Sequence, residues 1–327
     1  FADFAEDREE LFREFLSLEN GLPSHDTFSR LFRLIEPEAL SSAFARFLEQ
    51  LGSEGTGVVA IDGKTLRRSF DRAAGRSALH VVTAFASEAR LVIGQKAVPE
   101  GGNEITAARA LLELLDLKGT LVTADAIHCQ NATAQLVLER GGDYLFALKA
   151  NRPAMLGDVR AFFADPGSEG LAWHETTDAG HGRLEVRRHA VSHAVDWLFS
   201  SRRYPDEPQM PGLACLAMVE SNVERDGKTS RAVRYYLSSA KLTPERFAAA
   251  VRAHWGIENG LHWVLDTAFD EDRARTRKDH GPENLAVIRK LALNVLQRAR
   301  PGVSIRRKRK RSGWSDAFAR SVLGQMR

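Results

Sequence analysis

The chain has 327 residues and a net charge of +3, with 43% hydrophobic and 27% charged residues. This length and composition are typical of a globular protein with one large or two smaller domains. We find nothing that resembles a secretory signal or an apolar run of membrane length. The two cysteines, Cys129 and Cys215, fit a reduced cytoplasmic protein better than a disulfide scaffold. We therefore expect a cytoplasmic protein with no membrane partner.

The first segment, residues 1–55, is expected to be a small helical unit. Apolar residues between Arg8 and Leu18 recur at helical spacing. A second helix is expected after Pro23, where Ser24 or Asp26 can cap its first turn.

The next segment, residues 56–152, has the pattern of an α/β domain. Its order, β-β-β-α-β-α-β, requires crossover connections. Three antiparallel strands joined to two parallel ones would give a mixed sheet of the ribonuclease H type. The periodicity of the sequence requires an α/β domain but does not by itself require this type of sheet. Strands are expected at 58–61, 79–86, 91–98, 120–124 and 144–148, and helices at about 104–115, after a cap at Asn103, and at 130–140.

The first of these strands carries a motif that resembles a phosphate-binding loop. The stretch GVVAIDGKTLRRS contains Gly-Lys-Thr, but five residues separate Gly57 from Gly63, whereas a P-loop requires four. Those five residues begin with four apolar ones, which indicates a buried strand that cannot wrap a phosphate. We therefore predict an acid, Asp62, at the end of a buried strand and reject an ATPase.

A second acid ends a neighbouring strand. LVTAD places Asp125 after the strand at 120–124, as VVAID places Asp62 after the first strand. In a sheet of the ribonuclease H type these strand ends lie side by side, so the two carboxylates would repel each other unless a cation shares them. Mg²⁺ suits oxygen ligands and can also bind phosphate oxygens.

The remaining segments complete the domain. Residues 153–240 read as a β-rich insertion with a turn at Asp226-Gly227, and residues 241–300 as helices that complete the core, beginning near Thr243. Within these helices Glu258 could carry a third acid to the strand ends. Residues 301–327 form a basic tail, in which the run RRKRKR has six positive charges. Such a run is expected to be solvated or to bind nucleic acid.

Several motifs together resemble one family. AIDGKTLRRS, NEITA, TADAIHCQ, LKANRP, HGRLEVR and HWGIENGLHWVLDTAFDED, in this order, resemble the ISAs-one family of bacterial insertion-sequence transposases, also called H-repeat-associated proteins. GLPSHDTFSRLF resembles the helical segment that accompanies them, so the likeness covers nearly the whole chain.

The resemblance implies a DDE transposase with a ribonuclease-H-like core that cleaves and joins DNA strands at insertion-sequence ends. Carried over by motif, the catalytic and metal-binding residues are Asp62, Asp125 and Glu258. Two Mg²⁺ ions are implied, for which Mn²⁺ may substitute, with Asp62 bridging both. The implied partners are double-stranded DNA, from the transposon ends and the target, and a second copy in a homodimeric synaptic complex, in a nucleoid-associated bacterial protein.

One departure concerns the DNA contacts. Related transposases flank the Glu with Tyr, Arg and Lys at positions that are Val251, His254 and Leu265 here. Only His254 could be cationic, with Arg252 close by. We further expect phosphate contacts from residues just past strand ends and from the basic run. These candidates are Lys64, Arg67, Arg68, Lys149, Asn151, Arg152, Arg306, Arg307, Lys308, Arg309, Lys310 and Arg311.

Alternatives stay open at this point. His254, Glu258 and His262 are spaced as on one helical face, which could suggest zinc, but the zincin pattern is absent. The acids at 266 and 270–272 could be a solvated face, or Asp266 could assist the metal site. Trp255 and Trp263 could pack the helix or stack on a base. A nuclease that never joins strands, or a domesticated DNA-binding protein, would share most of these features.

Overall fold

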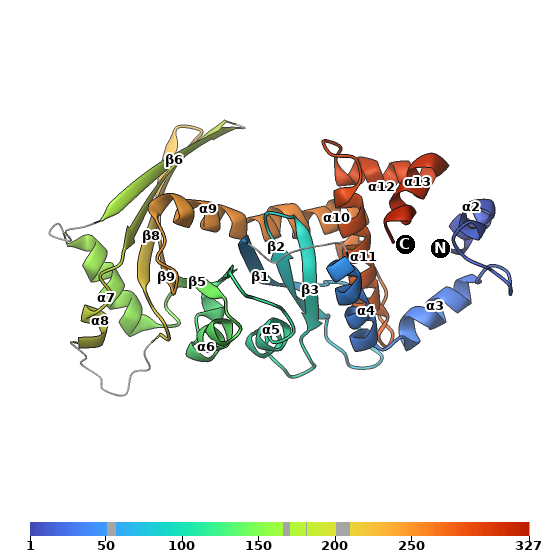
Figure 1. The fold of residues 1–327 in the computed structure, drawn as a ribbon, viewed down its shortest axis with the longest axis horizontal. Helices are drawn as coiled ribbons and strands as arrows, with labels where there is room; N and C mark the ends of the chain where they lie inside the picture. The colour runs from blue at the N-terminus through green and yellow to red at the C-terminus, as the bar shows by residue number, and fades with distance from the viewer. Residues whose placement is uncertain (51–56, 166–170, 181, 201–209, 327) are drawn as a thin grey trace.

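The computed structural model describes residues 1–50, 57–165, 171–180, 182–200 and 210–326. The molecule is elongated (Figure 1): one large sheet occupies one end and the middle, and helices from both termini lie together at the other end.

The sheet has nine strands in the order β3-β2-β1-β4-β5-β9-β8-β7-β6. β1 pairs antiparallel with β2, and β2 with β3. β1 pairs parallel with β4, and β4 with β5. The predicted mixture of antiparallel and parallel strands is therefore present. The strands are β1 (Gly57–Thr65), β2 (His80–Ala86), β3 (Leu91–Ala97), β4 (Thr120–Ala124), β5 (Asp143–Leu148), β6 (Ala172–Gly180), β7 (Arg183–Ser192), β8 (Cys215–Arg225) and β9 (Lys228–Ser238).

The first strand is longer than predicted. Its parallel pairing with β4 ends where Ile61 lies opposite Ala124. Its antiparallel pairing with β2 continues through Asp62 to Thr65. The prediction that the strand ends at Asp62 is therefore wrong, because β2 supplies hydrogen-bond partners after β4 has ended.

The β-rich segment extends the same sheet. β9 pairs antiparallel with β5, and β8, β7 and β6 follow in turn. The predicted turn joins β8 to β9, where Asp226 and Gly227 both have positive φ, as a two-residue hairpin turn requires. A continuous hydrogen-bonded ladder thus links the strands that carry Asp62 and Asp125 to the β-rich segment.

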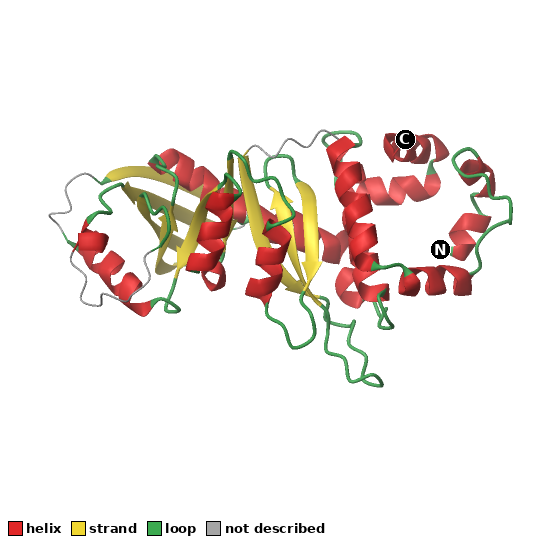
Figure 2. Ribbon diagram, turned by 60° about the horizontal axis from the view of Figure 1, so that its bottom comes forward, coloured by secondary structure: helices red, strands yellow, loops and turns green. Residues whose placement is uncertain are grey.

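Helices cover both faces of the sheet (Figures 1 and 2). α5, α6 and α7 pack on one face through a cluster that includes Leu111, Val137 and Val159. α4, α9, α10 and α11 pack on the other, through clusters that include Phe44 and Phe247. The helices are α1 (Ala2–Glu6), α2 (Glu9–Arg13), α3 (His25–Leu34), α4 (Pro37–Gln50), α5 (Glu104–Leu112), α6 (Asn131–Glu139), α7 (Pro153–Ala164), α8 (Trp197–Ser200), α9 (Pro244–His254), α10 (Trp263–Phe269), α11 (Gly281–Arg298), α12 (Ile305–Trp314) and α13 (Asp316–Leu323). Short 3₁₀ turns are η1 (Ala126–His128), η3 (Glu271–Arg273) and η4 (Gly324–Met326), and η2 (Ile257–His262) is a π-helix.

The predicted caps are correct, whereas two predicted segments differ. Ser24 and Asn103 each accept a backbone N–H at the start of α3 and α5, and Thr243, where a helix was expected to begin, does so at α9. The helix expected between residues 8 and 18 is only the five-residue α2. The basic run is part of α12, not an extended solvated tail. No helix among the described residues is long and apolar enough to cross a membrane.

Candidate active site

Three carboxylates from three elements surround the point where β4 ends. Asp62 lies in β1 and is half-buried, Asp125 follows β4 directly, and Glu258 lies in the π-helix η2. Asp125 and Glu258 line the same cavity of about 340 Å³, with Lys149, Arg234 and Trp255 around them. The fold therefore brings the three predicted acids to one region.

Asp62 lies in an acidic and partly buried environment. Burial raises the pKa of Asp62 to about 6, and the negative charges of Glu104, Glu258 and Asp125 also raise it. A hydrogen bond from the backbone N–H of Gly63 acts in the opposite direction. A carboxylate crowded by other carboxylates is stabilised in its charged form by a cation. All of these donors are oxygens, which Mg²⁺ prefers.

The acids do not form a closed metal cage. No group of three or more His, Cys, Asp or Glu side chains within the described ranges is close enough to hold an ion. Instead Lys149 Nζ lies 3.4 Å from Asp125 Oδ2, and His262 Nδ1 lies 3.5 Å from Asp62 Oδ2. The donor set suits a divalent cation, and its side chains would have to converge further to hold one.

Glu104 is a site residue that the sequence reasoning did not single out. Its carboxylate lies 2.7 Å from His80 Nε2 and 3.0 Å from His128 Nε2. The hydrogen bond from His128 has the largest effect on the pKa of Glu104. Together with the one from His80 it holds that pKa below its ordinary value. Because His128 ends the turn that follows Asp125, the His80–Glu104–His128 cluster ties that turn to β2 and α5.

Gly63 makes room for this cluster. A Cβ at Gly63 would lie 2.5 Å from His80 Nε2 and 2.6 Å from the Glu104 carboxyl carbon, closer than packed atoms tolerate. The glycine after Asp62 therefore serves close packing inside a strand, and the NEITA motif supplies the carboxylate that packs there.

His262 contacts Asp62 from the π-helix. Burial, with the charges of Lys290 and Lys64, lowers the pKa of His262 to about 3. Its Nε2 is buried and has no hydrogen-bond partner among the described residues. The imidazole is therefore neutral and can donate one hydrogen bond to Asp62.

Lys64 points into the protein. Its Nζ pairs with Asp266 and lies 3.1 Å from Glu271 Oε2. The Glu271 side chain is only 1% exposed, so the prediction of a solvated acidic face is wrong for this residue. Lys64 neutralises a buried carboxylate, and Asp266 is held by Lys64 and not by the three-acid site.

The other predicted contacts past the strand ends differ in exposure. Arg67 is 79% exposed and lies 3.5 Å from Asp272, and Arg68 is exposed as well. Asn151 donates to the carbonyl of the residue after Asp125 at 2.7 Å, and Arg152 donates to Asn131 at 2.8 Å. These last two therefore support the turn that follows β4.

The residues before Glu258 are also engaged inside the protein. Arg252 pairs with Asp178 of β6. His254 Nδ1 lies 3.0 Å from Thr123 Oγ1, and burial lowers its pKa, which favours the neutral imidazole over the cation that a phosphate contact would need. The π-helix after α9 displaces Glu258 and His262 from the face expected of an unbroken α-helix. Among the described residues, His254, Glu258 and His262 do not come together as a zinc site.

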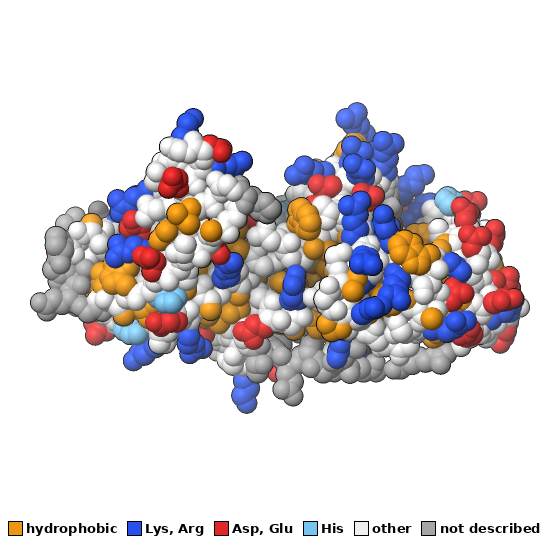
Figure 3. All heavy atoms as spheres, turned by 90° about the horizontal axis from the view of Figure 1, so that it is seen from above, with side chains coloured by type: hydrophobic (Ala, Val, Ile, Leu, Met, Phe, Trp, Pro, Cys, Tyr) orange, Lys and Arg blue, Asp and Glu red, His pale blue; other side chains and the backbone are white. Residues whose placement is uncertain are grey.

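The basic run lies in α12, and its side chains point both into the protein and into solvent. Lys308 is 3% exposed and donates to the carbonyls of Leu296 and Gln297, so the prediction of a solvated run is wrong at this position. Arg309 donates to the Ala268 carbonyl. The side chains of Arg306, Arg307 and Lys310 are exposed, and Figure 3 shows Lys and Arg gathered over the half of the molecule that holds α12.

Comparison with known proteins gives a consistent result. The family model described as "Transposase DDE domain" matches residues 53–295, and its associated model matches residues 1–48. The chain is 36% identical to the H repeat-associated putative transposase YhhI of Escherichia coli K12 over 98% of this chain and 86% of that protein. It is likewise 36% identical to the putative protein YbfL of the same organism, over the same shares. It is 43% identical to an uncharacterized protein in the dhlA 3′ region of Xanthobacter autotrophicus, over 74% of this chain and 81% of that protein.

Proposed function

Because the chain belongs to the DDE-domain family of insertion-sequence transposases, we propose that it cleaves DNA at the ends of an insertion sequence and joins those ends to target DNA. Asp62, Asp125 and Glu258 are the proposed ligands of two divalent ions, Mg²⁺ or Mn²⁺. The observation that carries the proposal is the position of Asp62 beside the end of β4, together with the cavity that Asp125 and Glu258 both line.

The topology supports the same proposal. The order β3-β2-β1-β4-β5, with β1 antiparallel to β2 and parallel to β4, is the order expected of a ribonuclease-H-like core. Asp62 lies in β1 just past its parallel pairing with β4, and Asp125 follows β4 directly, which fits the family's description as a DDE domain. We assign the third acid to Glu258 because the π-helix brings it to the cavity that Asp125 also lines.

The chain's own residues then have distinct tasks. Bound divalent ions would supply positive charge for the attacking and leaving oxygens of a phosphodiester. β1 positions Asp62 beside the end of β4, and the neutral His262 lies 3.5 Å from its carboxylate. The His80–Glu104–His128 cluster holds the turn after Asp125. Lys149, now beside Asp125, is free to turn to a phosphate once an ion takes that carboxylate.

The proposed duplex path uses the exposed cations. Arg67 and Arg68 lie past the end of β1, and Arg306, Arg307 and Lys310 lie on α12. Phosphate contacts position a duplex without reading its sequence. We further propose that two copies act together in a synaptic complex, because strand transfer at two transposon ends needs two such sites.

The test is a cleavage and joining assay. The protein is incubated with Mg²⁺ and DNA that carries the flanking repeats of its own locus, and the cut ends are mapped; a second reaction supplies pre-cut ends. We expect cleavage and joining by the wild type, and neither by Asp62→Asn, Asp125→Asn or Glu258→Gln, while all four bind DNA. Cleavage without joining would indicate a nuclease, and binding without cleavage a domesticated DNA-binding protein. Wild-type cleavage by Glu258→Gln would remove Glu258 from the site.

A further inference from the structure

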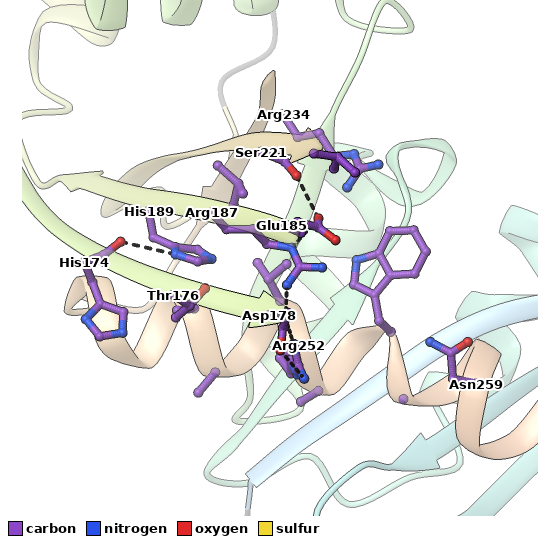
Figure 4. Close-up of a pocket in the computed structure, with 18 of the residues that line it drawn as sticks. His174, Thr176, Asp178, Glu185, Arg187, His189, Ser221, Arg234, Arg252 and Asn259 are labelled. Carbon is purple, nitrogen blue, oxygen red and sulfur yellow. Dashed lines mark hydrogen bonds and ion pairs between the residues drawn. The ribbon is translucent and has the colours of Figure 1, made fainter. Parts of the chain in front are cut away.

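A groove of about 1640 Å³ runs between the β-rich half of the sheet and helix α9 (Figure 4). Its walls are one face of β6, β7, β8 and β9 and the side of α9 that leads into the π-helix. Pockets for small ligands span roughly 300–1,000 Å³. The groove therefore suits an extended ligand better than a small molecule.

The groove is lined mainly by arginines. Alternate residues of a strand share one face, so the HGRLEVR motif places Arg183, Glu185 and Arg187 together in the wall. Six arginines line the groove against three carboxylates: Arg90, Arg183, Arg187, Arg225, Arg234 and Arg252. This excess of positive charge favours a polyanion.

An ion-pair chain already neutralises most of the carboxylates (Figure 4). Arg187 lies 2.8 Å from Glu185 and 2.5 Å from Asp178, and Asp178 also pairs with Arg252. Within the part of the chain that the structure describes, Arg234 makes no ion pair. Its guanidinium therefore remains available to an anion.

Trp255 lies between the groove and the cavity that Asp125 and Glu258 line. The guanidinium of Arg234 lies 5.3 Å from the centroid of the Trp255 ring. Trp255 is 39% exposed. Both residues line the groove and also the cavity that holds Asp125 and Glu258. The groove thus opens directly onto the proposed catalytic acids.

We propose that this groove binds a single DNA strand as it passes the catalytic acids, with phosphates on the arginines and a base stacked on Trp255. The proposal rests on the function proposed above. A positive groove with an aromatic face is the usual arrangement for single-stranded nucleic acid. A duplex keeps its bases stacked inside and offers no free base to Trp255, so the aromatic wall favours one strand.

The opposite face of the same sheet supplies a matched control. The Arg188 guanidinium lies 4.7 Å from the Trp173 ring centroid, and Trp173 is 40% exposed. Strand alternation turns both away from the groove. An arginine–tryptophan pair of similar geometry is therefore present on a face where no strand is expected.

The test measures binding of a labelled oligothymidine by fluorescence anisotropy in EDTA, where no cleavage occurs. We expect Trp255→Ala to weaken binding about 5- to 150-fold, the loss of one stacked base, and Trp255→Phe to restore much of it. Arg234→Ala should lower the slope of log affinity against log salt by about 0.7, one phosphate contact on a single strand. Trp173→Ala and Arg188→Ala should change neither quantity.

Two results would overturn the proposal: equal losses on both faces, or no loss at Trp255 in a variant that urea denaturation shows to be folded. A duplex that competes for the same site with the same dependence on Trp255 would also overturn it. The outcome is separable from that of the proposed function. If the protein cleaves DNA but the Trp255 and Arg234 variants bind the oligonucleotide as the wild type does, the proposed function stands and the groove proposal fails. If binding depends on these residues but no cleavage occurs, the groove proposal stands and the proposed function fails.

Discussion

Lys64→Ala should destabilise the protein strongly, although Lys64 looks like a DNA contact in the sequence. The substitution leaves Glu271, whose side chain is 1% exposed, without its nearest cation. Removing one partner of a buried pair costs about 3–5 kcal/mol. We expect the lower end, about 3 kcal/mol, because the charges of Lys290 and Arg289 also interact favourably with Glu271.

Urea denaturation followed by tryptophan fluorescence measures the effect. Arg67→Ala is the control, because Arg67 is 79% exposed and lies 3.5 Å from the half-buried Asp272, and pairs with an exposed cation contribute about 0–1 kcal/mol. The double variant Lys64→Ala/Glu271→Gln should recover much of the loss, since a neutral amide needs no counter-charge. A Lys64→Ala protein as stable as the wild type, with a shallower salt dependence of DNA binding, would refute the structural role and restore the DNA contact.

Three further outcomes are expected. The pKa of Glu104 lies below its ordinary value of 4.5, so its stabilisation is present above that pH and lost as pH falls through the folded pKa; Glu104→Gln should flatten this loss in acid denaturation. Lys308→Ala should lower the urea midpoint, whereas Arg307→Ala should leave it unchanged and lower the salt slope of duplex binding by about 0.9. Gly63→Ala should cost about 1–3 kcal/mol by overpacking against His80 and reduce cleavage, measured by urea denaturation and end mapping.

The elements that the sequence predicted well are those set by local patterns. Continuous apolar runs marked β1, β4 and β5 as buried strands, and a single side chain sufficed to predict each cap, such as Asn103 at α5. The three acids could be proposed because Asp62 and Asp125 each follow an apolar run and Glu258 belongs to a recognisable motif. These signals act over a few residues, so they can be read without the fold.

The features that were missed depend on distant partners. Lys64 is 202 residues from Asp266 in the chain, and no local pattern distinguishes it from an exposed lysine. Glu104 meets His80 and His128 only because the sheet places them together. The π-helix at Glu258 lies between α9 and α10, and the helical spacing of the sequence did not indicate it. Pairing of β9 with β5 was likewise invisible, because edge hydrogen bonds carry no side-chain signature.

The pairing of β9 with β5 fixes the distance between the β-rich segment and the strands that carry the acids. A domain on a flexible linker can swing, but strands joined by a ladder of backbone hydrogen bonds keep a fixed spacing and register. The ladder continues from β5 through β9 to β6, and the Arg252–Asp178 pair fastens its far end to α9. If the far strands hold DNA as proposed, this ladder keeps that DNA at a constant distance from Asp62 and Asp125. Residues added within the strands β6–β9 should change the register of this ladder and move the cleavage position on the DNA. Residues added only to the loops between these strands should leave the cleavage position unchanged.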